Sequence, residues 1–238
     1  MASWFSRRRP LVEIPRLKPR SEKRAATRVD LHELAPDLLG YLGQSAYLQL
    51  GVFESLSRAA SAASDFDAKD GISRAAGLAL AKYQGLVAEI RRRGDEPAAV
   101  MQPFAGAIDG FHAVVAGADW QECLLGVHVT AGLLDDFFIR LADGLTGDSG
   151  PRAAQVLGLD SGQDAVVQIL RDAIAADPRL ASRLAMWGRR LVGDTLLVAR
   201  SALHHSKNLD SDEQRIEPIF TELIAAHTRR MDALGLTA

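Results

Sequence analysis

Apolar residues recur along most of this chain at intervals of three and four residues, the spacing that places side chains on one face of an α-helix. β-branched residues are few and Ala and Leu dominate, which also favours helix over strand. The pattern predicts seven helices, over about residues 36–61, 68–93, 97–114, 119–145, 160–176, 178–205 and 211–234. Their predicted ends coincide with residues that typically begin or end helices, among them Pro36, Gly94, Asp119, Pro178 and Ser211.

Three of the predicted helices carry long seams that follow alternating steps of four and three residues. The seams consist of Leu38, Leu42, Ser45, Gln49, Val52 and Leu56; of Trp120, Leu124, Val127, Ala131, Leu134, Phe138 and Leu141; and of Leu180, Leu184, Trp187, Leu191, Asp194 and Val198. Long helices with such seams form up-and-down bundles. No linker separates two cores, so we predict one all-α domain over residues 31–238, with a core at about 37–206 and a last helix at about 211–234.

Polar residues interrupt these seams at a few positions. Ser45 and Gln49 lie within the first seam, Asp194 lies within the third, and Lys82 flanks the stripe of the second predicted helix. A buried polar group without a partner costs on the order of 1–3 kcal/mol, and a charge costs more. Either these side chains meet partners inside the bundle, or they turn toward solvent.

Composition narrows the class of protein. The 238 residues are 47% hydrophobic and 24% charged, which is typical of a globular chain, and no apolar run is long enough to span a membrane. The single cysteine, Cys123, excludes an internal disulfide and a cysteine-based zinc cluster, and we predict a small buried thiol there. No Walker loop, dinucleotide fingerprint or DNA-binding module is present. We predict a cytoplasmic protein.

Charge is distributed unevenly. Residues 1–30 carry nine basic and three acidic side chains, a net charge of +6, whereas the other 208 residues carry nineteen basic and twenty-seven acidic ones, a net charge of −8. This basic, proline-containing arm is typical of a solvated tail. Its Trp4, Phe5 and three consecutive arginines also suit contact with RNA or an acidic membrane surface.

Several short segments resemble the ferritin-like superfamily and, within it, the actinobacterial branch called MiaE-like after a tRNA hydroxylase. The resemblance covers about residues 37–206, and the segments that carry it are residues 47–56, residues 83–86, Phe111-His112 with Asp119-Trp120, residues 136–138 and residues 187–194. It implies a four-helix bundle that, in active members, holds two irons.

The resemblance also implies which positions hold the metal ligands. Such a centre needs one Glu from each of two helices and Glu-x-x-His from each of two others, yet no Glu of this chain is followed three residues later by His. The positions expected to carry ligands are occupied by Gln49, Ala79, Lys82, Ala131, Asp160 and Gln163. The one Asp-x-x-His, formed by Asp109 and His112, lies near a predicted helix end. We therefore predict a bundle with neither metal ligands nor catalytic residues.

Three hypotheses about function follow. The first is a non-catalytic scaffold or interaction protein without cofactor, acting with a protein partner or as a homodimer. The second is a non-heme di-iron monooxygenase that acts on tRNA, and the third is an adaptor that binds RNA or membrane through residues 1–30. Within the first, we predict that the Lys82 ammonium replaces the metal charge by pairing with Asp135, Asp136 or Asp194.

Overall fold

The computed structural model describes residues 34–203 and 209–238, where all regular secondary structure is helical. The long helices are α1 (Leu38–Ala62), α2 (Phe66–Arg92), α5 (Trp120–Leu141), α8 (Pro178–Ser201) and α9 (Leu209–Ala233). The shorter elements are α3 (Pro97–Met101), η1 (Gln102–Phe104), α4 (Ala105–Val115), η2 (Ala142–Gly144), α6 (Ser149–Leu157) and α7 (Gln163–Ala176). The all-α prediction is confirmed. The basic arm lies outside the described residues, and so do His204 and His205 at the end of the helix predicted over about 178–205.

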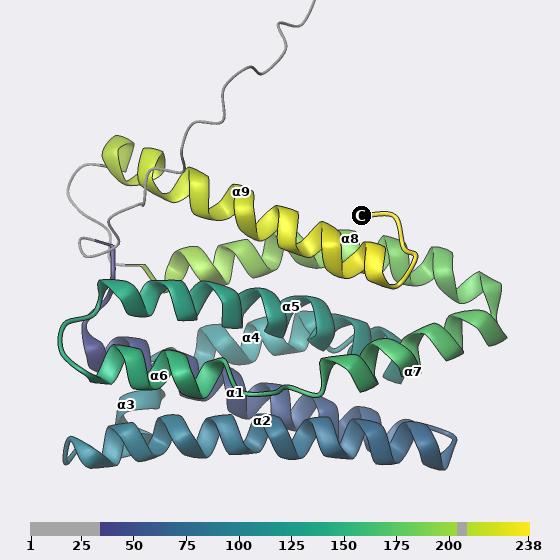
Figure 1. The fold of residues 1–238 in the computed structure, drawn as a ribbon, viewed down its shortest axis with the longest axis horizontal. Coiled ribbons are helices and arrows are strands. Elements are labelled where there is room, and N and C mark those ends of the chain that lie inside the picture. Colours follow the sequence, from purple (N-terminus) through teal and green to yellow (C-terminus); the bar gives the residue numbers. More distant parts are fainter. Residues whose placement is uncertain (1–33, 204–208) are drawn as a thin grey trace, which may run out of the picture.

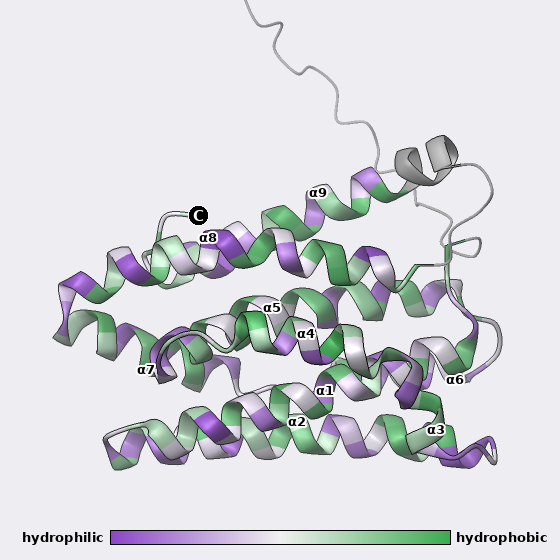
Figure 2. Ribbon diagram, turned by 180° about the vertical axis from the view of Figure 1, so that it is seen from behind, coloured by the Kyte–Doolittle hydropathy of each residue, from purple (hydrophilic) through white to green (hydrophobic). Residues whose placement is uncertain are grey.

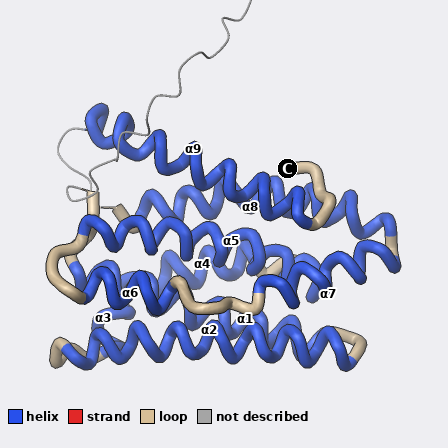
Figure 3. Tube along the Cα trace, in the orientation of Figure 1, coloured by secondary structure: helices blue, strands red, loops and turns tan. Residues whose placement is uncertain are grey.

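The helices are stacked in layers (Figure 1). The antiparallel pair α1 and α2 lies at one side, and α5 packs on α1 above it. Helices α6 and α7 follow one another along α2 and α5, so together they form one interrupted element, with a loop at its middle (Figure 3). Helices α8 and α9 cover the other side of α5, and α4 lies between α1 and α8. A four-part bundle of α1, α2, α5 and the α6–α7 element results.

Aspartates begin four of the helices. The side chains of Asp37, Asp65, Asp119 and Asp177 accept hydrogen bonds from backbone N–H groups of the first turns of α1, α2, α5 and α8. Each satisfies a donor that has no partner within its helix. Asp119 and Pro178 therefore have their predicted roles, whereas Pro36 precedes the Asp37 cap and lies outside α1.

Between residues 97 and 176 the helices differ from prediction in three ways. The helix expected over 97–114 is three pieces, because Pro103 lies in a 3-10 turn between α3 and α4 and has no N–H for a helical bond. Helix α6 was not predicted. Helix α7 begins at Gln163 after Gly162, whose φ of 67° lies in the left-handed region, so neither Asp160 nor Ser161 caps it through its side chain.

Hydrophobic and hydrophilic residues alternate along the helices (Figure 2), as in helices that bury one face and expose the other. The large buried side chains include Tyr41, Leu124, Phe137 and Phe138. The predicted seam of α8 is wrong by one position in its second half, since Thr195 is fully buried and Asp194 is only half-buried. Asp194 is therefore not a core residue. Within the described residues no helix combines the length and the apolar character needed to cross a bilayer.

Candidate functional site

The Lys82 side chain lies at the centre of the four-part bundle. Only 1% of this residue is exposed. Its Nζ donates to Asp135 Oδ2 at 2.8 Å, to the Leu157 carbonyl at 2.6 Å and to the Ser161 hydroxyl. The three hydrogen atoms of an ammonium are thus matched by three acceptors, one from α5 and two from the α6–α7 element.

The interruption between α6 and α7 supplies two of these acceptors. Leu157 is the last residue of α6, so its carbonyl has no partner within the helix, and the partial negative charge of a helix C-terminus favours a cation there. Ser161 follows in the loop. An uninterrupted fourth helix would have bonded its carbonyls internally, so the break in the α6–α7 element provides two of the three acceptors of the lysine.

Asp135 is held from two sides. Gln49 Nε2 on α1 donates to Asp135 Oδ1 at 2.6 Å, while Lys82 occupies Oδ2. Burial raises the pKa of the Asp135 carboxyl above its ordinary value, and the Lys82 ammonium and the Gln49 amide offset part of that rise. Of the three acidic partners predicted for Lys82, the structure selects Asp135.

The cavity beside this ion pair is small and mainly apolar. Its volume is about 20 Å³. Its apolar lining consists of Val52, Leu56, Ala79, Val127, Ala131 and Val166. A space of this size holds about one water molecule, whereas ligand pockets typically measure about 300–1,000 Å³. The centre of the bundle therefore has no room for a substrate.

His128 is a member of the site that the sequence did not indicate. It is buried on α5, and its Nδ1 is hydrogen-bonded to Oε1 of Gln163, at the start of α7. Its Nε2 is buried and has no hydrogen-bond partner within the described part of the chain. Burial lowers the pKa of His128, which favours the neutral ring. Leu125, not Glu, lies three residues before His128, so the Glu-x-x-His motif does not mark this histidine.

The structure brings together five of the six predicted positions. Gln49, Ala79, Lys82, Ala131 and Gln163 all line the central cavity. Asp160 does not, since its carboxylate accepts from the backbone N–H of Gly162 in the exposed loop before α7. Asp194 also lies away from this cavity, on α8.

These residues do not fit a di-iron centre. Among the described residues that line the cavity, Asp135 is the one carboxylate, and both of its oxygens are already hydrogen-bonded. The Lys82 ammonium repels a cation, the amides of Gln49 and Gln163 are weak ligands, and Ala79 and Ala131 offer none. Across the described residues, no three His, Cys, Asp or Glu side chains are grouped so that they could hold a metal ion.

Asp109 and His112 belong to a second polar groove, between α1 and α4. Tyr47 donates its hydroxyl to Asp109 Oδ1 at 2.7 Å, which raises the pKa of Tyr47 to about 12. The His112 ring packs on Gly51, where a Cβ would lie 2.0 Å from its Nε2, and burial lowers the pKa of His112 to about 4. The groove, of about 300 Å³, also contains Glu54 and Arg58 but is separate from the Lys82 site.

The predicted thiol lies elsewhere. Cys123 is buried on α5, where its Sγ contacts the Ser55 carbonyl, and burial raises the pKa of the thiol. A thiol with a raised pKa forms little thiolate and is a poor nucleophile. The prediction of a small buried thiol is confirmed.

A bundle of three long helices and an interrupted fourth, arranged around a polar centre, defines a ferritin-like protein. The sequence matches the family described as ferritin-like domain, actinomycetes, over residues 31–211, and the chain belongs to this family. No curated protein matches the sequence. The predicted superfamily and fold are therefore confirmed, whereas the MiaE-like branch and the cytoplasmic location stay predictions.

Proposed function

We propose that this protein is a ferritin-like scaffold that descends from di-iron enzymes of the MiaE-like kind and has exchanged the metal centre for a structural ion pair. The observation that carries the proposal is the Lys82 ammonium, buried against Asp135, the Leu157 carbonyl and Ser161. One protein cation here stands in for the charge that two irons supply in active members of the superfamily. It holds α2, α5 and the α6–α7 element together.

The positions around the cavity support this descent. Each of the four bundle elements contributes to the lining, with Gln49 on α1, Ala79 and Lys82 on α2, Ala131 on α5, and Gln163 on α7. A di-iron bundle draws its ligands from four helices in the same way. The four-element arrangement of the positions is retained, while the side chains are two amides, an ammonium and two methyl groups.

A scaffold acts through its surface. The central cavity of about 20 Å³ admits no organic substrate. The buried ion pair favours one packing arrangement of the helices and does not perform a reaction. We infer that the protein functions by binding another macromolecule or another copy of itself, with the bundle as a rigid support.

Iron loading tests the proposal. The full-length protein, produced in iron-replete medium and then titrated anaerobically with ferrous salt, is expected to retain no stoichiometric iron and to show no oxo-bridge absorption. A variant carrying Gln49→Glu and Lys82→Glu serves as the sensitivity control, because it places three carboxylates around the cavity and should bind added cation. About two irons per wild-type chain, with the oxo-bridge band, would instead support the di-iron tRNA hydroxylase.

The charge of residues 1–30 favours a second candidate, an adaptor that binds RNA through this arm. Phosphate contacts made by several Arg and Lys side chains weaken steeply as salt rises. Binding of the full chain to a tRNA, and loss of that binding in a chain lacking residues 1–30, would support the adaptor. Equal affinity with and without the arm, or binding only to acidic vesicles, would contradict it.

A further inference from the structure

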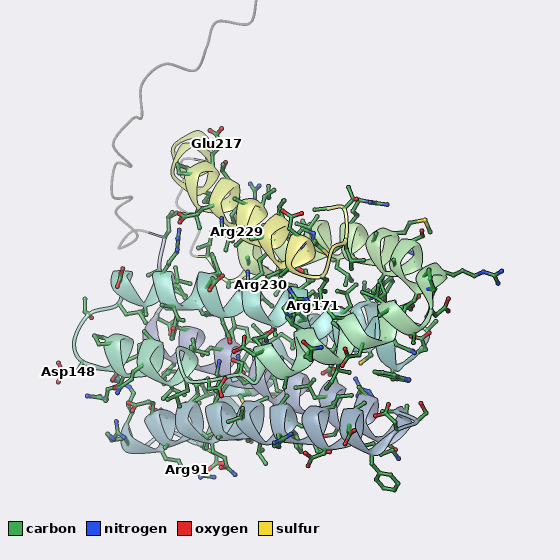
Figure 4. All side chains as sticks on the ribbon, turned by 45° about the vertical axis from the view of Figure 1, so that its right-hand side comes forward. Arg91, Asp148, Arg171, Glu217, Arg229 and Arg230 are labelled. Carbon is green, nitrogen blue, oxygen red and sulfur yellow. The ribbon has the colours of Figure 1, made fainter. Side chains whose placement is uncertain are left out.

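One face of α2 is exposed along the whole helix. It consists of Phe66, Asp70, Ser73, Gly77, Ala81, Gln84, Ala88 and Arg91, which follow one another at steps of three and four residues. The opposite side of α2 packs on α1, α6 and α7. Helix α2 therefore lies at one edge of the molecule, and Arg91 points away from the bundle there (Figure 4). We call these eight residues the outer face of α2.

Phe66 distinguishes this face from an ordinary solvated helix surface. It is 88% exposed, the highest value among the exposed large hydrophobic side chains of the described residues. The middle of the face carries Ser73, Gly77, Ala81 and Ala88, whereas solvated helices usually carry charged side chains. Side chains this small let a second helix approach closely.

The two ends of the face carry opposite charge. Of the eight residues of the face, Asp70 lies near the start of α2 and Arg91 lies at its end; Lys69 and Arg74 flank the start of the face. Two copies of α2 placed antiparallel would therefore put Asp70 of each near Arg91 of the other. A helix from an unrelated protein would need the same charge gradient by coincidence, but a second copy of this chain has it necessarily.

The antiparallel arrangement also matches side-chain sizes. With the symmetry axis between residues 80 and 81, Gln84 faces Gly77 of the partner subunit and Ala88 faces Ser73 of the partner subunit. The same register places Asp70 opposite Arg91 of the partner subunit. Among the described residues Asp70 pairs with Arg74, and both side chains of that pair are about 70% exposed, so the Asp70 carboxylate is accessible to a second cation.

The area of the face is adequate for a reversible dimer. The 27 residues of α2 span about 40 Å, and a strip about 11 Å wide amounts to roughly 900 Å² over two subunits. This area is slightly below the roughly 1,000 Å² at which stable specific interfaces begin, and it lies in the range of weak, transient complexes. Beside the face lies a groove of about 460 Å³ between α1 and α2, lined by Phe53, Lys69 and small side chains, among them Ser73 and Gly77 of the face.

We propose that the outer face of α2 is a homodimer interface, in which two copies of α2 pack antiparallel about a two-fold axis near Ala81. The isologous geometry means that each Asp70–Arg91 contact occurs twice. This inference goes beyond the proposed scaffold function, because it concerns only the surface of α2 and holds whatever occupies the centre of the bundle.

Charge reversal across the axis tests the proposal. The full-length wild type, followed by sedimentation velocity from ~1 to ~100 μM, is expected to convert reversibly from monomer to dimer. Asp70→Arg and Arg91→Asp should each weaken the dimer at least about tenfold, because each replaces two attractions by two repulsions. The variant carrying both changes restores opposite charges and should dimerise like the wild type. Asp232→Arg, the same charge change at an exposed position of α9, is the matched control.

Disulfide trapping tests the register. Ala81→Cys places two thiols at the axis and should give a covalent dimer on oxidation, whereas Leu197→Cys on the exposed face of α8 should not. The native Cys123 is buried and does not interfere. A wild type that stays monomeric at every concentration overturns the proposal. The proposal is also overturned if the wild type dimerises but the changes at Asp70 and Arg91 leave the dimer affinity unaltered and the Ala81→Cys variant forms no disulfide-linked dimer.

Discussion

Replacing Lys82 by Met tests the central ion pair most directly. Met matches the length of the lysine stem and removes the charge, so Asp135 keeps only its hydrogen bond from Gln49. Removing one partner of a buried ion pair typically costs about 3–5 kcal/mol, because an unpaired charge is left behind. For a chain of this size that loss lowers the melting temperature by roughly 10 °C.

Replacing Asp135 as well distinguishes the stability lost with the ion pair from the stability lost through changed side-chain packing. If Asp135 is replaced by Leu together with Lys82→Met, no buried charge remains, and the double variant should recover to within about 1–2 kcal/mol of the wild type. Urea denaturation followed by circular dichroism, at matched protein concentration, measures the free energy of unfolding of the wild type, of Lys82→Met, of Asp135→Leu and of the double variant. Lys69→Met, a half-buried lysine on the same helix, is the control and should change the stability by less than about 0.5 kcal/mol.

The pH dependence of the stability of these variants gives an independent check of the buried ion pair. The pKa of Asp135 is raised in the folded protein, so its contribution to stability is complete below the ordinary Asp pKa of about 4 and is lost as pH rises through the raised value. Without Lys82 that pKa rises further. The deficit of Lys82→Met should therefore be small near pH ~4.5 and largest near pH ~8. A Lys82→Met variant as stable as the wild type at every pH would refute the buried pair.

Three further outcomes are expected. The pKa of His112 is lowered to about 4, so its contribution to stability is present above its ordinary pKa of about 6.5 and is lost as pH falls toward 4. In the variant His112→Gln the urea midpoint should therefore change less between these two pH values. Gly51→Ala should destabilise by about 1–3 kcal/mol in thermal melts, because the new Cβ would lie 2.0 Å from His112 Nε2. Ser161→Ala should cost about 1.5–3 kcal/mol in urea denaturation, since it removes an acceptor from the Lys82 ammonium.

Each of these has a control within the chain. Gly77→Ala places a Cβ in open space on the outer face of α2, so it should not reproduce the loss expected for Gly51→Ala. Asp160→Ala removes a neighbouring loop acceptor that does not contact Lys82 and should cost less than Ser161→Ala. If the urea midpoint of His112→Gln falls between about pH 6.5 and 4 as steeply as that of the wild type, the lowered pKa of this histidine does not contribute to the stability of the fold.

The sequence by itself determined the helical class and the family. The spacing of apolar residues predicted the long helices, because burial of one face selects a period of 3.6 residues whatever the neighbours are. Asp119 and Pro178 marked helix starts through local hydrogen bonds and a preset backbone angle, which need no tertiary context. Gln49 and Lys82 stood out because they interrupted apolar stripes.

Only the tertiary structure decided what those polar residues meet. The acceptors of Lys82 come from positions 53, 75 and 79 residues further along the chain, and one of them is a backbone carbonyl freed by the end of α6. No sequence pattern identifies a carbonyl as a ligand, since every residue has one. The register of α8 was likewise set by packing, which buries Thr195 in place of Asp194. Local spacing determines helices, but the partners of a buried charge depend on how four distant segments are packed together.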